Sequence, residues 1–453
     1  MTKRIVIIGA GPTGLGAARR LRQLEHHDFT VYETLERPGG LSRSFIEDGF
    51  TWDIGGHVVF SHFADFDQLL EELLGDRRFE LERKSFIRIL DGWTPYPFQN
   101  NIRHLPPAAR LECLMGLYHL AGQQFAAPAN FREWCLQAFG EGIAKYFMFP
   151  QNFKVWATPL EQMSSKWIAD RVSMIDFERV LSNVVHERDD VGWGPNNSFC
   201  FPERGGTGAI YDTMATSLHD AIRYRAEVQA VDLEQKVVQL ADGSEDHFDH
   251  LISTMPLDLL VKRLTPRPEA LDAPTSDLKH SGTLIVGVGL EKPLGDDRCW
   301  MYFPEGNSPF YRATNFARYS RYNVPGGDTG RFSSFMCETS YSPHKPEDAS
   351  NIVERTIDGL IATGLMEPGD RERVVTTFLF DADYSYPTPT LGRDAALSAI
   401  QPFLEEHGIH SRGRFGAWRY EVGNMDHSVQ MGIEIIDRLL QGKEETVIAE
   451  QHG

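Results

Sequence analysis

The N-terminal segment alternates between apolar and polar stretches in the order strand, helix, strand. Ile5 to Ile8 is a short β-branched run, which is typical of a strand buried in a parallel sheet. Leu15 to Leu24 has helical character, with small residues early and arginines late. Phe29 to Tyr32 predicts a second strand, which ends at Glu33. The pattern therefore predicts a βαβ unit.

From about Leu105 to Val185 the periodicity becomes helical. Asn130 and Glu133 resemble a capping box at the start of one of these helices. Another helix shows an apolar face with the spacing i, i+3, i+4, i+7. The residues of that face are Leu111, Leu114, Met115 and Tyr118.

Two Asp-Gly dipeptides predict β-hairpins on either side of this helical block. Asp91-Gly92 separates residues 86–90 from 93–96, and Asp242-Gly243 separates 237–240 from 248–253. The remaining predictions are strands at Leu284–Leu290 and Thr376–Phe380, a loop at 326–330, a last helix from about Asp426 to Leu440, and a polar tail after Gly442 that we expect to fray.

The chain has 453 residues, which is enough for two or three domains. It carries 45 Lys and Arg against 64 Asp and Glu, a formal net charge of −19. This balance argues against nucleic acid and against an anionic membrane surface as partners. An anionic small substrate then needs a few arginines that make a locally positive pocket.

The five cysteines are scattered and form no CxxC pair, which fits a reduced, cytoplasmic protein better than a disulfide scaffold or a zinc site. We expect no targeting peptide and no membrane helix, because no apolar stretch is long enough. His407 and His410 have a ligand-like spacing, but their polar neighbours suggest an exposed turn. We therefore expect no metal site.

Gly9, Gly11 and Gly14 form a GxGxxG fingerprint between the first strand and the first helix. The glycines allow a tight turn, a close approach to a pyrophosphate, and close packing of helix on strand. Glu33 follows nineteen residues after Gly14, where a carboxylate can accept a hydrogen bond from a ribose hydroxyl. The sequence thus predicts a dinucleotide site.

Two further glycine pairs favour FAD over NAD. Gly39-Gly40 precedes Leu41 and Ser42, and Gly55-Gly56 precedes His57. Glycine pairs let backbone amides approach a flat ring or a phosphate, although both pairs can also be plain turns. The chain contains no second GxGxxG for a separate nicotinamide domain.

A C-terminal segment runs from Arg412 through Arg414 and Gly423-Asn424-Met425 into the last helix. The positive end of that helix, aimed at the flavin N1 and C2 carbonyl, would stabilise an anionic reduced flavin, and Arg414 would add to it. The alternative is an ordinary Asn or Asp N-cap.

Aromatic and amide residues cluster in two strings, 96–101 and 147–156, where rings can stack a nucleobase and amides can bind its edge. The alternative is that these rings belong to the core. Arg171 and Arg312 can clamp a diphosphate in a bidentate manner, unless they are surface residues. Four tyrosines offer hydroxyl donors beside them: Tyr302, Tyr319, Tyr386 and Tyr420.

The chain resembles the eukaryotic-type UDP-galactopyranose mutases, a family of FAD enzymes. The matching strings are GGHVVFSHF, PYPFQNNI, NFKVWATP, GWGPNNSF, FPERGGTGAI, CWMYFPEGNSPFYRAT, YPTPTLGR and SRGRFGAWRYEVGN, which span residues 55 to 424. The resemblance implies an α/β fold with a Rossmann-like FAD-binding domain, a helical domain, and a mainly antiparallel sheet domain. The implied boundaries are 1–76, 196–260 and 395–453 for the FAD domain, 101–195 for the helical domain, and 77–100 with 261–394 for the sheet domain.

The resemblance also implies roles for individual residues. The uridine would be held by Tyr96, Phe98, Gln99, Phe147, Asn152 and Trp156. Arg171 and Arg312 would clamp the diphosphate, with further diphosphate and sugar contacts from Tyr302, Tyr319, Tyr386, Tyr420 and Asn196. His57 lies on a loop beside the flavin that moves with the flavin redox state. The flavin would be bound by Gly9, Gly11, Thr13, Gly14, Glu33, Gly40, Leu41, Ser42, Gly55, Gly56, Val228, Arg414, Gly423, Asn424, Met425 and Ser428, and the nicotinamide reductant by Arg83, Ser85 and His62.

The activity implied by the resemblance is the interconversion of UDP-galactopyranose and UDP-galactofuranose without net redox. Reduced FAD would act through N5 as a covalent nucleophile, and NADPH or NADH would supply the electrons. Two alternatives stay open: a mutase for another UDP sugar, and a flavin oxidoreductase of the amine-oxidase type. A third, a non-catalytic dinucleotide-binding protein, is disfavoured because His57, Arg171 and Arg312 are all present.

The sequence departs from the family pattern at a few positions. Met425 stands where a flavin-contacting Gln is expected, so a side-chain amide is lost. The loop after Tyr322 and the C-terminal tail are shorter than in the fungal members. These differences leave the oligomeric state open, and a homo-oligomer is compatible with the sequence.

Overall fold

The predicted βαβ unit is confirmed by a computed structural model, which describes residues 3–168, 174–192 and 198–449. β1 (Ile5–Ile8) and β2 (Phe29–Tyr32) are parallel neighbours joined by α1 (Pro12–Gln23). Every residue of β1 is buried, which explains why the strand is apolar throughout.

Strands from distant parts of the chain complete this parallel sheet. In the described residues its order is β20-β13-β1-β2-β9, where β9 is Ile222–Arg223, β13 is His250–Ser253 and β20 is Ile409–Ser411. α1, α2 (Ala64–Leu74), α7 (Gly208–Thr216) and α12 (Met425–Gln441) share one hydrophobic core with the sheet. The last predicted helix is thus confirmed, and it packs in the same core as the first helix.

Helices α1 and α12 touch at backbone distance because each offers a glycine. A Cβ at Gly16 would lie 2.6 Å from the Val429 carbonyl oxygen. A Cβ at Gly432 would lie 2.1 Å from the Thr13 carbonyl oxygen and 2.7 Å from the Ala17 nitrogen. Neither position has room for a side chain, so these two glycines fix the spacing of the helices.

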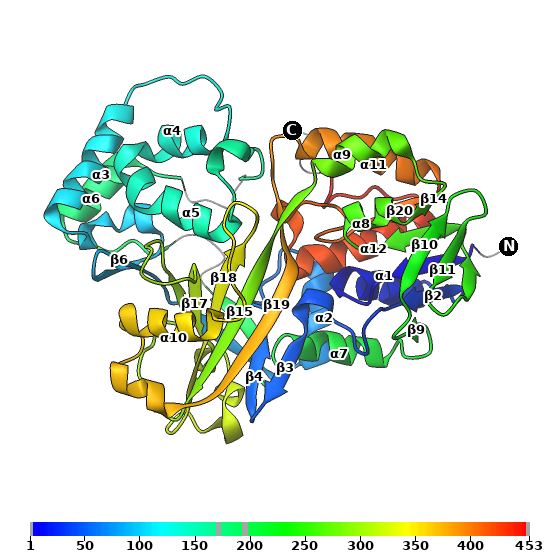
Figure 1. Ribbon diagram of the computed structural model, residues 1–453, viewed down its shortest axis with the longest axis horizontal. Coiled ribbons are helices and arrows are strands. Elements are labelled where there is room, and N and C mark those ends of the chain that lie inside the picture. Colours follow the sequence, from blue (N-terminus) through cyan, green and yellow to red (C-terminus); the bar gives the residue numbers. More distant parts are fainter. Residues whose placement is uncertain (1–2, 169–173, 193–197, 450–453) are drawn as a thin grey trace.

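A long, mainly antiparallel sheet crosses the middle of the molecule (Figure 1). Its order in the described residues is β19-β15-β18-β17-β16-β6-β7, and only the β16–β6 pair in it is parallel. The bounds are β6 Ser85–Ile89, β7 Gly92–Pro95, β15 Lys279–Leu290, β16 Trp300–Tyr302, β17 Arg312–Asn315, β18 Ser333–Tyr341 and β19 Val374–Thr388. The strand predictions at 284–290 and 376–380 and the Asp91-Gly92 hairpin are confirmed.

The helical region lies at one side of this sheet and the parallel sheet at the other (Figure 1). Its helices are α3 Pro107–Leu120, α4 Phe131–Ile143, α5 Phe149–Trp156 and α6 Phe177–Val185, with a π-helical turn at Ala144–Met148. The N-cap prediction for α4 is confirmed, because Asn130 Oδ1 accepts the Glu133 amide at 3.0 Å. Together these regions confirm the predicted fold class, whereas the domain boundaries stay a prediction.

The apolar face predicted for α3 points away from the core. Leu111, Met115 and Tyr118 are 60, 41 and 59% exposed, and Leu114 is half-buried. The buried face instead carries the small residues Ala109 and Cys113, together with Leu117. Small side chains are needed at the contact because α4 approaches very closely: a Cβ at Gly142 would lie 2.6 Å from the Cys113 Cα. Spacing alone did not identify the buried face.

The hairpin predicted around Asp242-Gly243 forms with a different second strand. β11 (Val237–Leu240) pairs with β12 (Glu245–His247), in a small sheet that also contains β10 (Val228–Asp232) and β14 (Leu264–Thr265). The apolar run that follows becomes β13 and joins the parallel sheet beside β1. This run is buried, so a central position in the sheet suits it better than a hairpin does.

The C-terminal tail does not fray before residue 449. Glu445 accepts hydrogen bonds from Arg412 Nε at 2.5 Å and Nη2 at 2.7 Å, and from Arg438 at 2.7 Å. Val447 is buried as well. His410, expected on an exposed turn, is buried in β20. The tail and His410 were both predicted to be exposed because their neighbours are polar. In the fold, such polar neighbours form hydrogen bonds within the protein.

The remaining elements connect these layers. They are β3 Ser44–Glu47 with β4 Phe50–Asp53, β5 Arg78–Glu82 with β8 Ser198–Pro202, α8 Leu257–Lys262, α9 Asp272–Ser276, α10 Ile352–Ala362 and α11 Arg393–Glu406. Among the described helices, none combines the length and apolar character that a bilayer crossing needs.

We predict that Gly432→Ala lowers the free energy of unfolding by about 3 kcal/mol, because an added Cβ forces α12 away from α1. Chemical denaturation measures this loss. Gly369→Ala is the matched control, because a Cβ there meets nothing within 4 Å. Equal stability of the two variants would contradict the role of this helix contact.

Candidate active site

The turn between β1 and α1 contains two glycines that the protein's own packing requires and one that it does not. Gly9 has a φ of +98°, and a Cβ at Gly14 would lie 1.9 Å from the Gly9 carbonyl oxygen. A Cβ at Gly11 would only reach ordinary contact with the Gly40 Cα, at 3.8 Å. Packing alone therefore does not require a glycine at position 11, which fits a backbone that a pyrophosphate must approach closely.

Glu33 places a buried carboxylate beside this turn. Its Oε2 accepts the Ala10 amide at 2.7 Å, and its Oε1 accepts the Leu35 amide at 2.9 Å. Each oxygen keeps a lone pair for a ribose hydroxyl. The first amides of α1, which begins after Gly11, add partial positive charge for a phosphate. The chain's residues thus fit a dinucleotide such as FAD.

The N-terminus of α12 is the second positive helix end in this region. Asn424 is its N-cap residue, but its side chain makes no capping hydrogen bond. The alternative of an N-cap at Asn424 therefore holds for its position, but without the side-chain hydrogen bond of an ordinary cap. Arg414 lies beside this end, with Nε donating to the Gly423 carbonyl at 3.0 Å and Nη1 to the Ser385 carbonyl at 3.1 Å.

Several of the other predicted cofactor residues are covered in the fold. Thr13, Ser42, Val228, Met425 and Ser428 are buried, and Gly40, Leu41 and Ser42 form a 3₁₀ turn. Their contacts with a cofactor stay a prediction.

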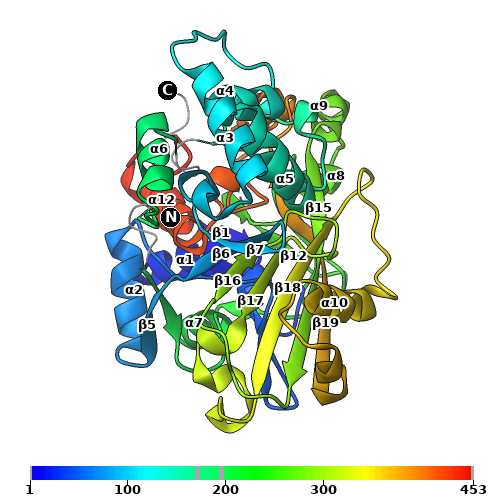
Figure 2. The ribbon, with the colours of Figure 1, turned by 90° about the vertical axis from the view of Figure 1, so that its left-hand side faces the viewer.

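A row of unpaired buried polar atoms crosses three strands of the long sheet. Ser85, Trp300 and Thr314 are register partners on β6, β16 and β17, which lie side by side in Figure 2. Ser85 Oγ, Trp300 Nε1 and Thr314 Oγ1 have no hydrogen-bond partner in the described part of the chain. Buried polar groups are normally paired, so this row indicates a place where a polar ligand or ordered water binds. Sequence reasoning missed Trp300 and Thr314, which lie inside apolar strings.

Arg312 is paired with a buried carboxylate that the sequence analysis did not identify. Its Nε donates to Glu338 Oε1 at 2.7 Å, and its Nη2 contacts Glu338 Oε2. Glu338 also accepts the Gly56 amide at 2.9 Å and the Tyr311 hydroxyl at 2.7 Å. Burial would raise the pKa of Glu338, but Arg312 and the other donors hold it below its usual range. A lone Glu in the apolar strand FMCETSY was the available signal.

His57 is buried within the electrostatic reach of Arg414 and Arg312. Its Nδ1 is buried and has no hydrogen-bond partner among the described residues. Burial and the positive charges of Arg414 and Arg312 together lower the pKa of His57 to about 4, against an opposing effect of Glu338. The imidazole is therefore neutral at pH 7 and can accept or donate one hydrogen bond.

The predicted tyrosines form a connected cluster, with one exception. Tyr386 lies 5.6 Å from Tyr420 between ring centroids, and its hydroxyl lies 3.5 Å from Arg312 Nη2. Tyr302 stacks on Tyr96 at 5.4 Å. Tyr319 instead packs in an aromatic core, and its hydroxyl has no partner among the described residues.

The predicted uridine residues include rings that are fully covered. Phe98 and Phe147 stack at 4.8 Å, and Phe98 and Trp156 are almost inaccessible. Asn152 donates to the Met148 carbonyl of its own helix at 2.7 Å, and Gln99 is buried. Trp156 contacts Tyr420 at 4.7 Å, which joins this group to the tyrosine cluster. Arg171 and Asn196 lie outside the described residues.

The three residues predicted for the nicotinamide reductant lie near the same site. Arg83 stacks over Trp300 at 4.4 Å, and Arg312 stacks over the same indole at 4.3 Å. The backbone amide of His62 donates to Asp426 Oδ2 at 3.1 Å, and its Nδ1 lies 2.8 Å from the same oxygen. Asp426 also pairs with His427, and ligand atoms of these three residues lie within 4.8 Å. The positive end of α12 disfavours a cation there.

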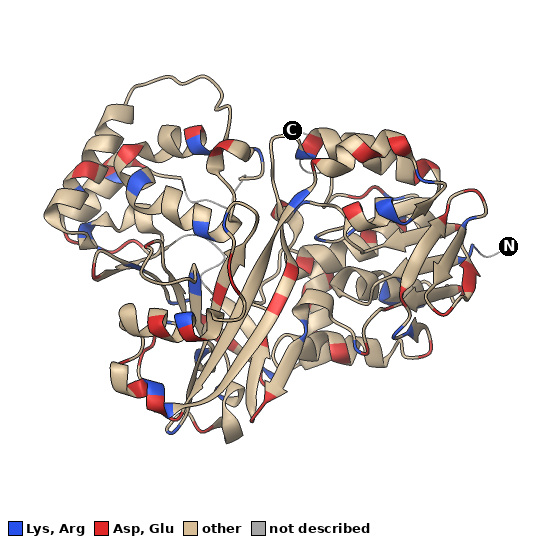
Figure 3. Cartoon of the chain, viewed as in Figure 1, with Lys and Arg blue, Asp and Glu red and all other residues tan. Residues whose placement is uncertain are grey.

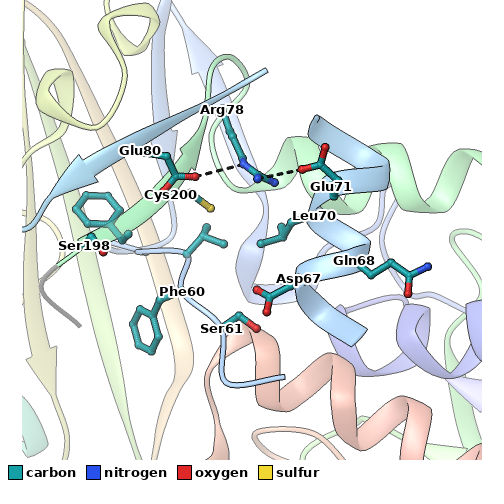
Figure 4. Close-up of a pocket in the computed structure, with 12 residues that line it drawn as sticks. Phe60, Ser61, Asp67, Gln68, Leu70, Glu71, Arg78, Glu80, Ser198 and Cys200 are labelled. Carbon is teal, nitrogen blue, oxygen red and sulfur yellow. Dashed lines mark hydrogen bonds and ion pairs between the residues drawn. The ribbon is translucent and has the colours of Figure 1, made fainter. Parts of the chain in front are cut away.

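A cavity of about 590 Å³ lies beside the loop that follows His57. Figure 4 shows its lining, which includes Phe60, Ser61, Asp67 and Cys200. Arg78 in this cavity already pairs with Glu71 at 3.1 Å and Glu80 at 3.4 Å. None of the lining residues belongs to the predicted site, so the cavity is a neighbour of the site and not its binding pocket.

The description "flavin containing amine oxidoreductase" belongs to a family model that matches residues 12–326. A solved structure of reduced UDP-galactopyranose mutase is 43% identical, with a TM-score of 0.96, over 100% of this chain and 97% of that one. The chain belongs to the flavin-containing amine oxidoreductases, among the UDP-galactopyranose mutases. The resemblance drawn from the sequence is confirmed, and the family supports FAD as the cofactor.

More distant relatives share parts of the chain or the fold alone. A putative protoporphyrinogen oxidase from Exiguobacterium sp. 255-15 has a TM-score of 0.74 at 16% identity, over 98% of this chain and 100% of that one. Protoporphyrinogen oxidase 2 of Arabidopsis thaliana is 35% identical over 56% of this chain and 58% of its own length. A phytoene desaturase of Myxococcus xanthus is 46% identical over 13% of this chain. The chain spans 11% of that desaturase, so this match covers a single short segment.

We predict that Gly11→Val folds but purifies without FAD, because a Cβ there makes only ordinary contact with the protein but its branched side chain would stand where a pyrophosphate approaches the backbone. The ratio of flavin to protein absorbance and the circular dichroism spectrum measure both properties. Gly14→Ala is the comparison, and we expect it to damage the fold itself. A yellow Gly11→Val protein would contradict the assignment of this turn.

We predict that His57 titrates near pH 4 in the folded protein. Because this pKa lies below the unfolded value of about 6.5, the unfolded chain binds the proton first. The contribution of His57 to stability is thus fully present above pH 6.5 and is lost as the pH falls toward 4. NMR titration of histidine-labelled protein measures the pKa, with His57→Gln for assignment. A midpoint near 6.5 would refute the prediction.

Proposed function

We propose that the protein interconverts UDP-galactopyranose and UDP-galactofuranose, with reduced FAD as its cofactor. The observation that carries the proposal is the match over the whole chain to the reduced UDP-galactopyranose mutase. The chain's own geometry also supports the proposal. One region contains Arg312 paired with Glu338, the tyrosine cluster and a neutral His57.

The proposed role of Arg312 is to hold the diphosphate of the nucleotide. Glu338 occupies its Nε and takes one contact from Nη2, which leaves Nη1 for an anion. Tyr386 and Tyr420 would add hydroxyl donors, and Arg171 is proposed as the second clamp. A UDP leaving group that stays bound keeps a high effective concentration beside the sugar, which favours its return after ring opening.

When bound and reduced, the flavin supplies the nucleophilic N5 for the anomeric carbon of the sugar. The protein would favour the electron-rich form of the ring through the N-terminus of α12 and Arg414. His57 is neutral and adds no charge that would compete with these groups. Tyr96, Phe98, Gln99, Phe147, Asn152 and Trp156 are proposed to form the uridine end of the site.

We further propose that NADPH or NADH reduces the enzyme at Arg83, Ser85 and His62, in the cytoplasm. The cysteines support a reducing compartment, because all five are free and buried. The stacking of Arg83 and Arg312 on one indole supports a shared anion-binding surface for reductant and substrate.

The test is to incubate the holoenzyme with UDP-galactofuranose, with and without dithionite or NADPH, and to follow UDP-galactopyranose by chromatography. We expect conversion only under reduction. UDP-arabinopyranose and UDP-N-acetylgalactosamine serve as competing substrates for the alternative mutase. Release of hydrogen peroxide from an amine, without conversion of any UDP sugar, would favour the oxidoreductase alternative.

We predict that Arg312→Ala lowers kcat by about 10²–10³-fold, because it removes a preorganised charge at the diphosphate. The variant should still bind FAD, because Arg312 is linked to the predicted cofactor glycine Gly56 only through Glu338. Steady-state kinetics and flavin absorbance measure the two effects. The control is Arg331→Ala, which removes an exposed partner of Glu291. Near-normal turnover of Arg312→Ala would remove the clamp assignment.

A further inference from the structure

The segment 55–62, here called the His57 loop, is attached at both ends to buried carboxylates. At its start, the Gly56 amide donates to Glu338 Oε1 at 2.9 Å. At its end, the backbone amide and Nδ1 of His62 contact Asp426 Oδ2, at 3.1 and 2.8 Å. Both carboxylates are almost fully covered. His57 lies between the two attachments.

The start of the loop packs tightly against Glu338 and its neighbours. A Cβ at Gly56 would lie 2.5 Å from Thr314 Oγ1 and 3.4 Å from the Trp300 ring. A Cβ at Gly55 would lie 3.3 Å from Glu338 Oε2. The glycine pair therefore serves a close approach of the loop to β16, β17 and β18, in addition to any contact with a flavin.

One oxygen of Glu338 binds both the loop and the clamp. Oε1 accepts the Gly56 amide and Arg312 Nε, at 2.9 and 2.7 Å. The other oxygen accepts the Tyr311 hydroxyl at 2.7 Å and contacts Arg312 Nη2. A carboxylate offers about four acceptor positions, so these partners use the whole group. Glu338 cannot shift toward one partner without weakening its bonds to the others.

The opposite side of the loop has room for movement. Val59, Phe60 and Ser61 line the cavity of about 590 Å³ beside it (Figure 4). Val59 itself is buried, and its carbonyl accepts the Cys200 amide at 2.8 Å, so the loop has a third attachment there. The space beside Phe60 and Ser61 leaves room for local movement between these attachments.

We infer that Glu338 is a positioning residue that couples the anion site at Arg312 to the conformation of the His57 loop. An anion bound to Arg312 competes with Glu338 for the guanidinium charge and so changes the bonds of the oxygen that holds Gly56. In the opposite direction, a shift of Gly56 reorients Glu338 and with it Arg312. The inference rests on the proposed function only in taking UDP as the anion.

The test compares hydrogen–deuterium exchange of the His57 loop in the holoenzyme with and without UDP. In the wild type we expect UDP to change the deuterium uptake of the loop peptide. In Glu338→Gln we expect higher uptake that no longer responds to UDP, and a Kd for UDP raised at least tenfold. Glu338→Asp should recover part of both effects, because it restores the charge.

Glu445→Gln is the matched control, because it also removes a buried carboxylate with a bidentate arginine partner, Arg412. It touches neither the loop nor Arg312. We expect lower stability, but a UDP response equal to that of the wild type. If Glu338→Gln does not fold, Tyr311→Phe removes only one bond to Oε2 and should weaken the response partially.

Two results would overturn the inference: a loop in the wild type that ignores UDP, or a Glu338→Gln protein that keeps the full response. If Glu338→Gln binds UDP more weakly but its loop responds as in the wild type, Glu338 acts on Arg312 alone. This result would also overturn the coupling. A wild type whose loop responds to UDP, but which converts no UDP sugar, would refute the proposed function and support the coupling. If UDP does not bind at all, inorganic pyrophosphate is the probe for the same anion site.

Discussion

The contact between α1 and α12 at Gly16 and Gly432 sets the geometry on which the site depends. Both helices direct their N-termini toward the predicted cofactor, one at the fingerprint turn and one at Asn424. The two positive ends can act on one ligand only if the helices lie at a fixed, short spacing. Because the close contacts are between backbone atoms, no side-chain rearrangement can compensate for an added methyl group.

The second half of the site is built on neighbouring strands and not on loops. Arg312 on β17 is the register partner of Glu338 on β18 and of Tyr302 on β16. Residues that are far apart along the chain are therefore held at strand spacing, in a sheet that is buried on both faces at this point. This arrangement explains how an arginine and its carboxylate remain paired in the interior, because Glu338 keeps its full set of hydrogen bonds.

The sequence predicts the cofactor half of the molecule better than the substrate half, for a physical reason. The βαβ unit is local, and two of its glycines have local requirements: Gly9 has a positive φ, and a Cβ at Gly14 would collide with the Gly9 carbonyl. The family strings identified Arg312, His57 and the tyrosines, because these match residue by residue. Glu338 was missed because its importance comes from three partners on other segments. The face of α3 was assigned wrongly because the buried face combines the small residues Ala109 and Cys113 with Leu117, and does not carry the large apolar residues of the predicted stripe.

The net charge of −19 is compatible with an anionic substrate because the charges are distributed unevenly. Figure 3 shows acidic and basic residues interspersed over the outer helices and loops. In the described site, by contrast, Arg83, Arg312 and Arg414 lie near one another around Trp300, His57 and Tyr386. Glu338 neutralises part of this charge, and it does so through a group that also holds the His57 loop. Charge compensation and loop position therefore depend on the same buried carboxylate, so the local field at the site cannot change without a change at the loop.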